Sequence, residues 1–311
     1  MKNENDSLLI EILSKTNWRH KIKLSNDIYT PGYCAENEWE LCQLPKSLKG
    51  LSFLDVASND GMYSYIAEKK GATKVVGVDI YGNDEILHMT DSWDISKPKL
   101  IKEYFNLSAD FHSLSVMHLS ELKQKFDYVL CSNLLAWLTD PFAALKSMSD
   151  VTNKVLHLRE DISTLKGKPA LELVHKGDGS CYYNPNKEYF IQVLTQLGFK
   201  KIEFSVINER NLLIERLSKQ CLVNFEIGTP IYLNPFTMQE VSKTDSTKLH
   251  ICLFIYKDYY FIERLGWVKK ENIKTQQPFV LGRRYPYLTA FNKIMKNKLN
   301  LEKNYVIKAT R

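Results

Sequence analysis

Two acidic side chains and the turn between them carry the clearest chemical signal in the sequence. A short apolar run at 51–57 contains Asp55, a tight turn ends near Gly61, and a second apolar run at 73–79 ends on Asp79. In a parallel sheet, such acids lie at the carboxyl ends of neighbouring strands, where nucleotide ligands bind. An acid about 20 residues beyond the turn can accept hydrogen bonds from both hydroxyls of a ribose. The segment therefore predicts a site for a ligand that contains a nucleoside.

The turn departs from the glycine pattern of a dinucleotide site. Ala57 and Asn59 occupy the first two glycine-like positions, and only Gly61 remains. Without three glycines, the turn offers no close cradle for a pyrophosphate. An S-adenosylmethionine (SAM) site needs a small turn, an acid near the methionine ammonium and a carboxylate for the ribose, and Asp55 and Asp79 would supply the two acids. The alternative is an ordinary strand–turn–helix unit without a ligand.

Strands and helices alternate around this turn. Such alternation indicates an α/β, Rossmann-like, mostly parallel sheet with helices on both faces. Expected strands lie at 51–57, 73–79, 112–117, 125–131, 153–159 and 200–206, and expected helices follow the first turn and lie near 97–106, 141–149 and 186–197. After about residue 207 the alternation ends. There, 221–227 and 250–256 are expected to be strands that finish the sheet in antiparallel fashion, and 287–299 is expected to be a helix.

These patterns divide the chain into three expected parts: an N-terminal helical segment (1–50), a SAM-binding Rossmann-like core (51–207), and a C-terminal stretch (208–311) that completes the sheet and extends from it. The 311 residues include 44% hydrophobic and 25% charged residues, which excludes a disordered chain, a collagen and a coiled coil. Apolar runs such as 251–256 are far shorter than the roughly 18 residues of a membrane span.

The cysteines and the N-terminus point to the cytoplasm. The six cysteines include no C-x-x-C pair and no metal-ligand spacing, so we expect reduced thiols and no metal. The N-terminus lacks the apolar stretch of a signal peptide.

Positive charge gathers at the end of the chain. Residues 242–311 contain 15 Lys and Arg against 5 Asp and Glu, an excess of 10, whereas the remaining residues carry a net charge of −4. This asymmetry hints at a separate partner surface. The alternative is a solvated, lysine-rich segment without a partner.

Five segments resemble one known family in sequence and in order. They are NWRHKIKLSNDIYTPG (17–32), LPKSLKGLSFLDVASNDGMYS (44–64), GATKVVGVDI (71–80), HSLSVMHLSELKQKFDYVLCSNLLAWLTDPFAAL (112–145) and NPNKEYFIQVLTQLGFKKIEF (184–204). The chain resembles class I SAM-dependent methyltransferases, in particular the branch of the tRNA wobble-uridine carboxymethyltransferases and their small-molecule-modifying relatives. The resemblance implies the class I methyltransferase fold and SAM, or its carboxylated form, as cofactor.

The resemblance and the strand ends together nominate site residues. The expected cofactor-binding residues are Trp18, Thr30, Asp55, Ala57, Asn59, Gly61, Asp79, Ile80, His118, Leu119 and Asn133. The expected catalytic candidates are His20, Trp137 and Glu160. His20 and Glu160 could act as general bases, and Trp137 could stack on a planar acceptor. The family often has Leu-Tyr-His-Leu where this chain has Leu-Ala-Trp-Leu at 135–138, so its usual acceptor is in doubt.

Three functions follow as hypotheses. The first is a methyltransferase that acts on an O or N atom of a small molecule, a glycan or a natural product. The altered pair at 136–137 and the non-basic body favour this function. The second is a tRNA wobble-uridine modifying enzyme, whose RNA would contact the basic C-terminal stretch. The third is a non-catalytic SAM-fold binding subunit. No membrane partner is expected, and the oligomeric state stays open.

Overall fold

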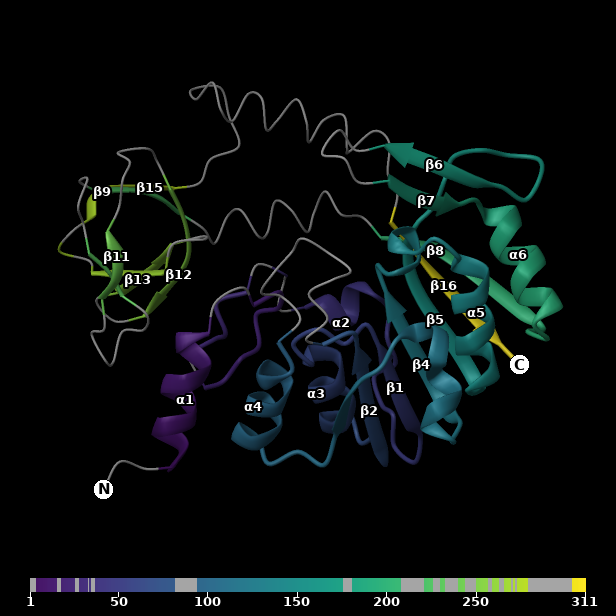
Figure 1. Cartoon of the computed structure of the whole chain (residues 1–311), viewed down its shortest axis with the longest axis horizontal. Helices are drawn as coiled ribbons and strands as arrows, with labels where there is room; N and C mark the ends of the chain where they lie inside the picture. Colours follow the sequence, from purple (N-terminus) through teal and green to yellow (C-terminus); the bar gives the residue numbers. More distant parts are fainter. Residues whose placement is uncertain are drawn as a thin grey trace.

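The protein was analysed as a computed structural model (Figure 1). The structure describes residues 4–15, 18–25, 28–32, 34, 37–81, 94–175, 181–207, 221–225, 230–232, 240–243, 250–256, 259–262, 266–269, 271, 273–278 and 304–311. The helix expected at 287–299 lies outside these residues.

A seven-stranded sheet organises the core, in the order β3-β2-β1-β4-β5-β16-β8. Its strands are β1 (Ser52–Val56), β2 (Lys74–Asp79), β3 (Asp110–Ser113), β4 (Phe126–Ser132), β5 (Thr152–Asp161), β8 (Lys201–Val206) and β16 (Asn304–Thr310). Strands β3, β2, β1, β4 and β5 pair in parallel. This arrangement confirms the expected Rossmann-like α/β sheet.

Helices cover both faces of the sheet. They are α1 (Glu4–Ser14), α2 (Glu38–Leu41), α3 (Met62–Lys69), α4 (Ser96–Tyr104), α5 (Pro141–Asp150) and α6 (Lys187–Gln196), and two short 3₁₀ helices are η1 (Val116–Leu122) and η2 (Leu135–Trp137). Successive strand residues point to opposite faces. Phe53 therefore packs in the cluster that contains residues of α1 to α4, and Leu54 packs in the cluster that contains residues of α5 and α6 (Figure 1).

The end of the chain, and not the two segments expected at 221–227 and 250–256, finishes the core sheet. β16 lies antiparallel between β5 and β8. Arg311 fixes the end of this strand, because its Nη2 donates to the carbonyl of Ser149 at 2.7 Å and its Nε donates to the carbonyl of Thr152 at 3.0 Å. The alternation in the sequence stops long before this strand, so local pattern could not reveal it.

The segments at 221–227 and 250–256 are strands, as expected, but they belong to a second sheet. That expectation of a sheet finish is therefore wrong. The second sheet has the order β11-β10-β14-β13-β12-β9-β15 among the described residues. Its strands, which pair in antiparallel fashion, are β9 (Cys221–Phe225), β10 (Pro230–Tyr232), β11 (Glu240–Lys243), β12 (His250–Tyr256), β13 (Tyr259–Ile262), β14 (Gly266–Lys269) and β15 (Ile273–Pro278). Between β8 and β16, the described residues of the chain thus form a separate antiparallel sheet that is inserted into the core.

A hairpin that the sequence analysis missed follows β5. Strands β6 (Leu171–His175) and β7 (Cys181–Pro185) pair in antiparallel fashion, and η2 lies beside β7. Within the described ranges, no helix is long and apolar enough to cross a membrane. The same residues contain no group of His, Cys, Asp and Glu side chains suited to a metal ion, and Cys42 and Cys131 are buried free thiols.

Candidate functional site: a turn that holds a cofactor

The turn after β1 keeps a glycine-type backbone with a single glycine. Ala57, Asn59 and Gly61 have φ values of 60°, 49° and 79°, so alternate residues are left-handed. For an alanine this conformation costs about 1–2 kcal/mol, whereas asparagine and glycine tolerate it better. Hydrogen bonds hold the turn, because the Gly61 amide donates to the Ser58 carbonyl at 2.8 Å and the Ser58 amide donates to the Val78 carbonyl at 3.0 Å. The missing glycines therefore change the side chains of the turn but not its course.

Gly61 itself has no room for a side chain. A Cβ atom there would lie 2.8 Å from Cβ of Pro98 and 3.0 Å from the ring of Phe111. Gly61 also precedes the first turn of α3. Gly61 is thus required both by its backbone angle and by the close approach of α4 and β3.

Asp79 ties the end of β2 to the turn. Its Oδ2 accepts a hydrogen bond from the Asn59 amide at 2.9 Å, and its Oδ1 accepts one from the Ile80 amide at 2.8 Å. Burial raises the pKa of Asp79 to about 6. A carboxylate has about four lone-pair positions, so both oxygens can still accept a hydrogen bond from a ribose hydroxyl. The predicted ribose residue is therefore placed beside the predicted turn.

Asp55 faces helix α3. Its Oδ2 accepts hydrogen bonds from the Ser64 amide at 3.0 Å and from Ser64 Oγ at 2.8 Å. Burial raises the pKa of Asp55 to about 7, against the opposing effect of these bonds. Asp55 thus joins the strand to the helix that follows the turn.

Two further groups complete the turn. Tyr81, which the sequence analysis missed, donates from its hydroxyl to the Asn59 carbonyl at 2.8 Å and lies 2.7 Å from Ser58 Oγ. Asn59 Oδ1 is buried and has no hydrogen-bond partner among the described atoms. A buried acceptor without a donor is costly. The ammonium group or the ribose hydroxyls of SAM would supply the missing donor, so the residues present fit this cofactor.

The other expected cofactor residues lie in different surroundings. Trp18 is buried, and its Nε1 donates to the Ile12 carbonyl at 3.2 Å. Thr30 is buried and uses its hydroxyl within the N-terminal segment, where it accepts from the Ile22 amide and donates to the His20 carbonyl. Both side chains thus support the segment that leads into the core.

In η1, His118 is exposed beside Glu121, whereas the adjacent Leu119 is fully buried. Asn133 follows β4 in a left-handed conformation, with a φ value of 56°. Its amide donates to the Arg159 carbonyl at 2.7 Å. Asn133 therefore marks a sharp turn at the end of β4, one strand away from Ala57.

The three catalytic candidates have distinct environments. His20 is buried, and its Nδ1 lies 2.5 Å from Oδ1 of Asp60, a residue that the sequence analysis did not nominate. Trp137 in η2 is 41% exposed. Glu160 is buried, and its Oε1 accepts from the Leu134 and Leu135 amides at 2.9 and 3.1 Å.

Burial raises the pKa of Glu160 to about 8, against the opposing effect of the two amides. Glu160 therefore holds a proton at neutral pH. This state suits a donor better than the general base expected from the sequence.

A buried ion pair joins the N-terminal segment to the core. Arg159 Nη1 on β5 lies 2.6 Å from Glu38 Oε2 on α2. The Tyr63 hydroxyl donates to the same carboxylate at 3.4 Å and lies 3.4 Å from Cys42 Sγ. These residues lie far apart in the sequence, so no local pattern could have predicted the cluster. This cluster fixes α2 against β5 and α3.

The fold and this site define a class I SAM-dependent methyltransferase. Comparison with known families supports the assignment, because residues 34–203 match the model of the methyltransferase domain family. This match covers more than half of the chain, and the chain belongs to that family. The predicted family and the predicted cofactor, SAM, are thereby confirmed.

Individual relatives are distant. The tRNA U34 carboxymethyltransferase of Sulfurovum sp. (strain NBC37-1) is 23% identical over 203 residues, which are 63% of this chain and 63% of that protein. This chain thus matches less than two thirds of that relative.

The solved structures to which this chain is similar also share little sequence identity with it. The [4+2]-cyclase SpnF is 12% identical, with a TM-score of 0.52 over 98% of this chain and 92% of the other. The N-terminal domain of EvdMO1, solved in the presence of S-adenosylhomocysteine (SAH) and D-fucose, is 16% identical, with a TM-score of 0.47 over 65% of this chain and 90% of the other.

Proposed function

We propose that this protein transfers the methyl group of SAM to an oxygen or nitrogen atom of a small-molecule, glycan or natural-product acceptor. One observation supports the part of the proposal that concerns the cofactor. The left-handed turn at 57–61 leaves the Asn59 Oδ1 acceptor buried and unpaired beside Asp79. In this proposal, Asp79 binds the ribose and Asn59 binds the methionine end.

Bound SAM supplies a methyl group on a positively charged sulfur, which is already a strong electrophile. The protein therefore contributes mainly by holding the acceptor in line, an effect worth several kcal/mol. Asp79 and the turn are proposed to hold SAM, and Trp137 is proposed to stack on a planar acceptor. We also propose that the protein is cytoplasmic.

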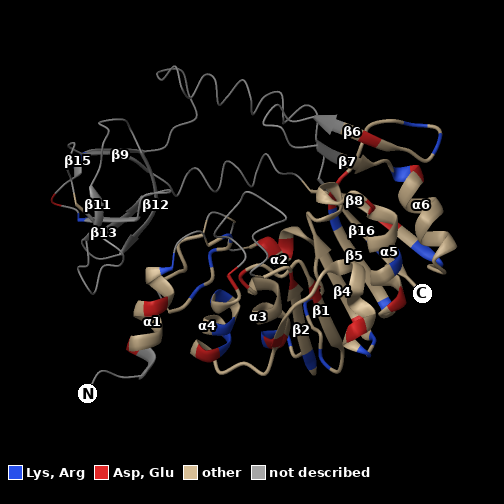
Figure 2. Ribbon diagram, in the orientation of Figure 1, with Lys and Arg blue, Asp and Glu red and all other residues tan. Residues whose placement is uncertain are grey.

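The acceptor preference rests on charge. Basic and acidic residues are interspersed over the core ribbon (Figure 2). Arg311, part of the basic C-terminal stretch, donates hydrogen bonds to the carbonyls of Ser149 and Thr152 and thus stabilises the fold. A small acceptor needs no extended basic surface, whereas RNA binding depends on one.

The first experiment is a calorimetric titration of SAM into the wild type and Asp79→Ala. We expect at least a tenfold weaker affinity in the variant, because charged hydrogen bonds contribute about 1.5–3 kcal/mol. Asp110→Ala is the matched control, since Asp110 lies exposed at the start of β3 and, among the described residues, its carboxylate pairs only with Lys102, at 3.3 Å. Unchanged affinity in Asp79→Ala would contradict the assignment of Asp79.

A tRNA wobble-uridine acceptor is the second candidate. It is supported by the distant carboxymethyltransferase relative and by the excess of 10 positive charges in 242–311. The two candidates are separated by incubating the enzyme with SAM and either unmodified tRNA or a panel of hexoses, nucleoside-diphosphate hexoses, amines and phenols, and measuring SAH. Product with tRNA alone would overturn the small-acceptor proposal. Carboxy-SAM is tested as the alternative donor in the same assay.

A further inference from the structure

Asp60, in the proposed cofactor turn, accepts several hydrogen bonds. It is fully buried, and its Oδ2 accepts from the His20 amide at 2.8 Å and from the Arg19 amide at 3.0 Å. Its Oδ1 is bonded to His20 Nδ1. Burial alone would raise the pKa of Asp60, but the interactions with His20 outweigh burial and lower it. Asp60 is therefore a carboxylate that faces an imidazole.

This carboxylate decides which ring nitrogen of His20 carries the proton. An ionised carboxylate can only accept, so Nδ1 must be the donor. Whenever the ring is neutral, its lone pair is then on Nε2. Among the described residues, no hydrogen bond to Nε2 is found. The described residues thus leave Nε2 to a molecule that binds at this turn.

The backbone around His20 holds the ring in place. Thr30 Oγ1 donates to the His20 carbonyl at 2.6 Å, and Tyr63 packs edge-on against the ring with centroids 5.5 Å apart. A Cβ atom at Gly32 would collide with the His20 carbonyl, so only glycine lets the backbone at residue 32 approach His20 so closely. His20 is therefore a rigidly mounted base and not a mobile surface residue.

Other charged groups act on the pair from neighbouring elements. Lys97 on α4 helps to lower the pKa of Asp60, and Asp60 in turn helps to raise the pKa of Asp55 on β1. Arg19, beside His20, acts on Asp79, whose pKa it helps to lower. Because Asp60 is part of the turn itself, between Asn59 and Gly61, the imidazole lies against the cofactor site and not at a distance from it.

We propose that Asp60 positions His20 and that His20 Nε2 accepts the proton of a hydroxyl acceptor. This inference rests on the proposed function and narrows it to O-methylation of an alcohol or a phenol. A neutral amine already has a free electron pair, whereas a hydroxyl is a weak nucleophile until a base takes its proton. When SAM is bound, the acceptor oxygen bonds to the methyl carbon as the carbon–sulfur bond breaks, and that electron pair stays on sulfur. The hydroxyl proton moves to Nε2, and Asp60 stabilises the resulting imidazolium.

The first test needs no acceptor. In ¹⁵N-histidine NMR spectra of the full chain, we expect His20 to carry its proton on Nδ1, and Asp60→Asn to populate the Nε2-protonated form. The His20 signals are assigned by their loss in His20→Asn, with the exposed β3 residue His112, changed to Gln, as the control. An Nε2-protonated ring in the wild type, or an unchanged ring in Asp60→Asn, would overturn the pairing.

The second test separates chemistry from binding. His20→Asn retains a side-chain donor toward Asp60, so we expect SAM affinity within about threefold of wild type, whereas loss of a general base lowers the rate by about 10²–10⁴-fold. SAH release is measured with the hexose, nucleoside-diphosphate hexose and phenol panel, and His112→Gln is expected to match wild type.

Full activity in His20→Asn, or SAH release with amines but not hydroxyls, would overturn this inference while leaving methyl transfer intact. If the wild type fails to bind SAM, the proposed function itself fails.

Discussion

The protonated state of Glu160 leads to a quantitative prediction about stability. Glu160 lies at the end of β5, fully buried, and its pKa rises from the usual 4.5 to about 8. Between these two values, the folded chain binds one more proton at this site than the unfolded chain does. Stability must therefore fall as the pH rises from about 4.5 to about 8.

Glu160→Gln removes this titration but keeps an oxygen for the Leu134 and Leu135 amides. Each pH unit within the interval corresponds to about 1.4 kcal/mol. The titration of Glu160 should therefore lower the free energy of unfolding by about 3–4 kcal/mol between pH 5 and pH 8. Asp55 and Asp79 also have raised pKa values, so they act in the same direction and their contribution remains in the variant.

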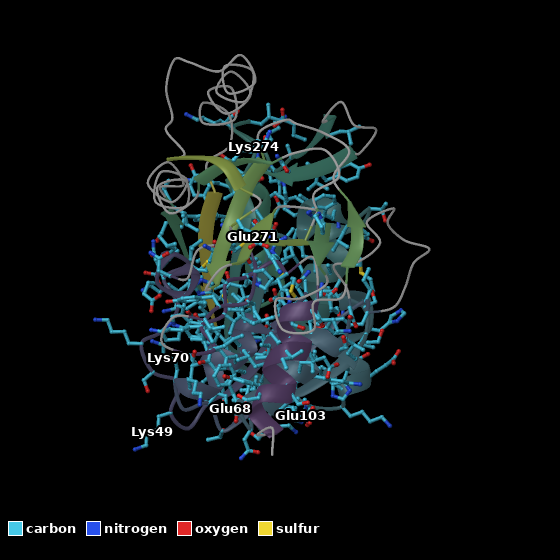
Figure 3. All side chains as sticks on the ribbon, turned by 90° about the vertical axis from the view of Figure 1, so that its left-hand side faces the viewer. Lys49, Glu68, Lys70, Glu103, Glu271 and Lys274 are labelled. Carbon is cyan, nitrogen blue, oxygen red and sulfur yellow. The ribbon has the colours of Figure 1, made fainter. Side chains whose placement is uncertain are left out.

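The assay is urea unfolding at pH 5, 6, 7 and 8. We expect the free energy of unfolding to fall less steeply with pH in Glu160→Gln than in the wild type, with a difference of several kcal/mol across the range. Glu103→Gln is the control, because Glu103 is an exposed glutamate at the surface of α4 (Figure 3). Parallel pH curves for the wild type and Glu160→Gln would refute the reasoning.

Three further substitutions test the framework. Gly61→Ala should lower stability by about 1–3 kcal/mol in thermal unfolding, and Gly167→Ala, at a φ of 97° with open space around it, isolates the backbone cost from the clash. Glu38→Ala leaves Arg159 buried without its carboxylate and should cost about 3–5 kcal/mol, which pairing with Arg159→Met should partly recover. Equal costs in the single and double variants would argue against the ion pair. Arg311→Met should lower the melting temperature through loss of the bonds that end β16, and an unchanged temperature would show that they contribute little.

The sequence identified the cofactor turn through local pattern alone. Asp55 and Asp79 end apolar runs, and the small residues between them mark a turn, so composition and spacing sufficed. The helix expected at 141–149 also depends on local residues, because Asp140 accepts a hydrogen bond from the Ala143 amide at 2.9 Å and precedes a first-turn proline.

The pattern could not show that Ala57 and Asn59 would adopt the left-handed angles of the glycines they replace. Those angles are imposed by Val78 and Asp79, which approach the turn from the neighbouring strand.

The sequence by itself therefore determined the alternating core, the cofactor class and the acids at the strand ends, because each depends on residues close together in the chain. Only the tertiary structure decided which residues from distant parts of the sequence contact each other. Asp60 meets His20 from 40 residues away, and Arg159 meets Glu38 across 121 residues. The last strand of the core comes from the end of the chain, beyond an inserted sheet. Such contacts arise when separate elements pack on one sheet, and periodicity within any one element carries no information about them.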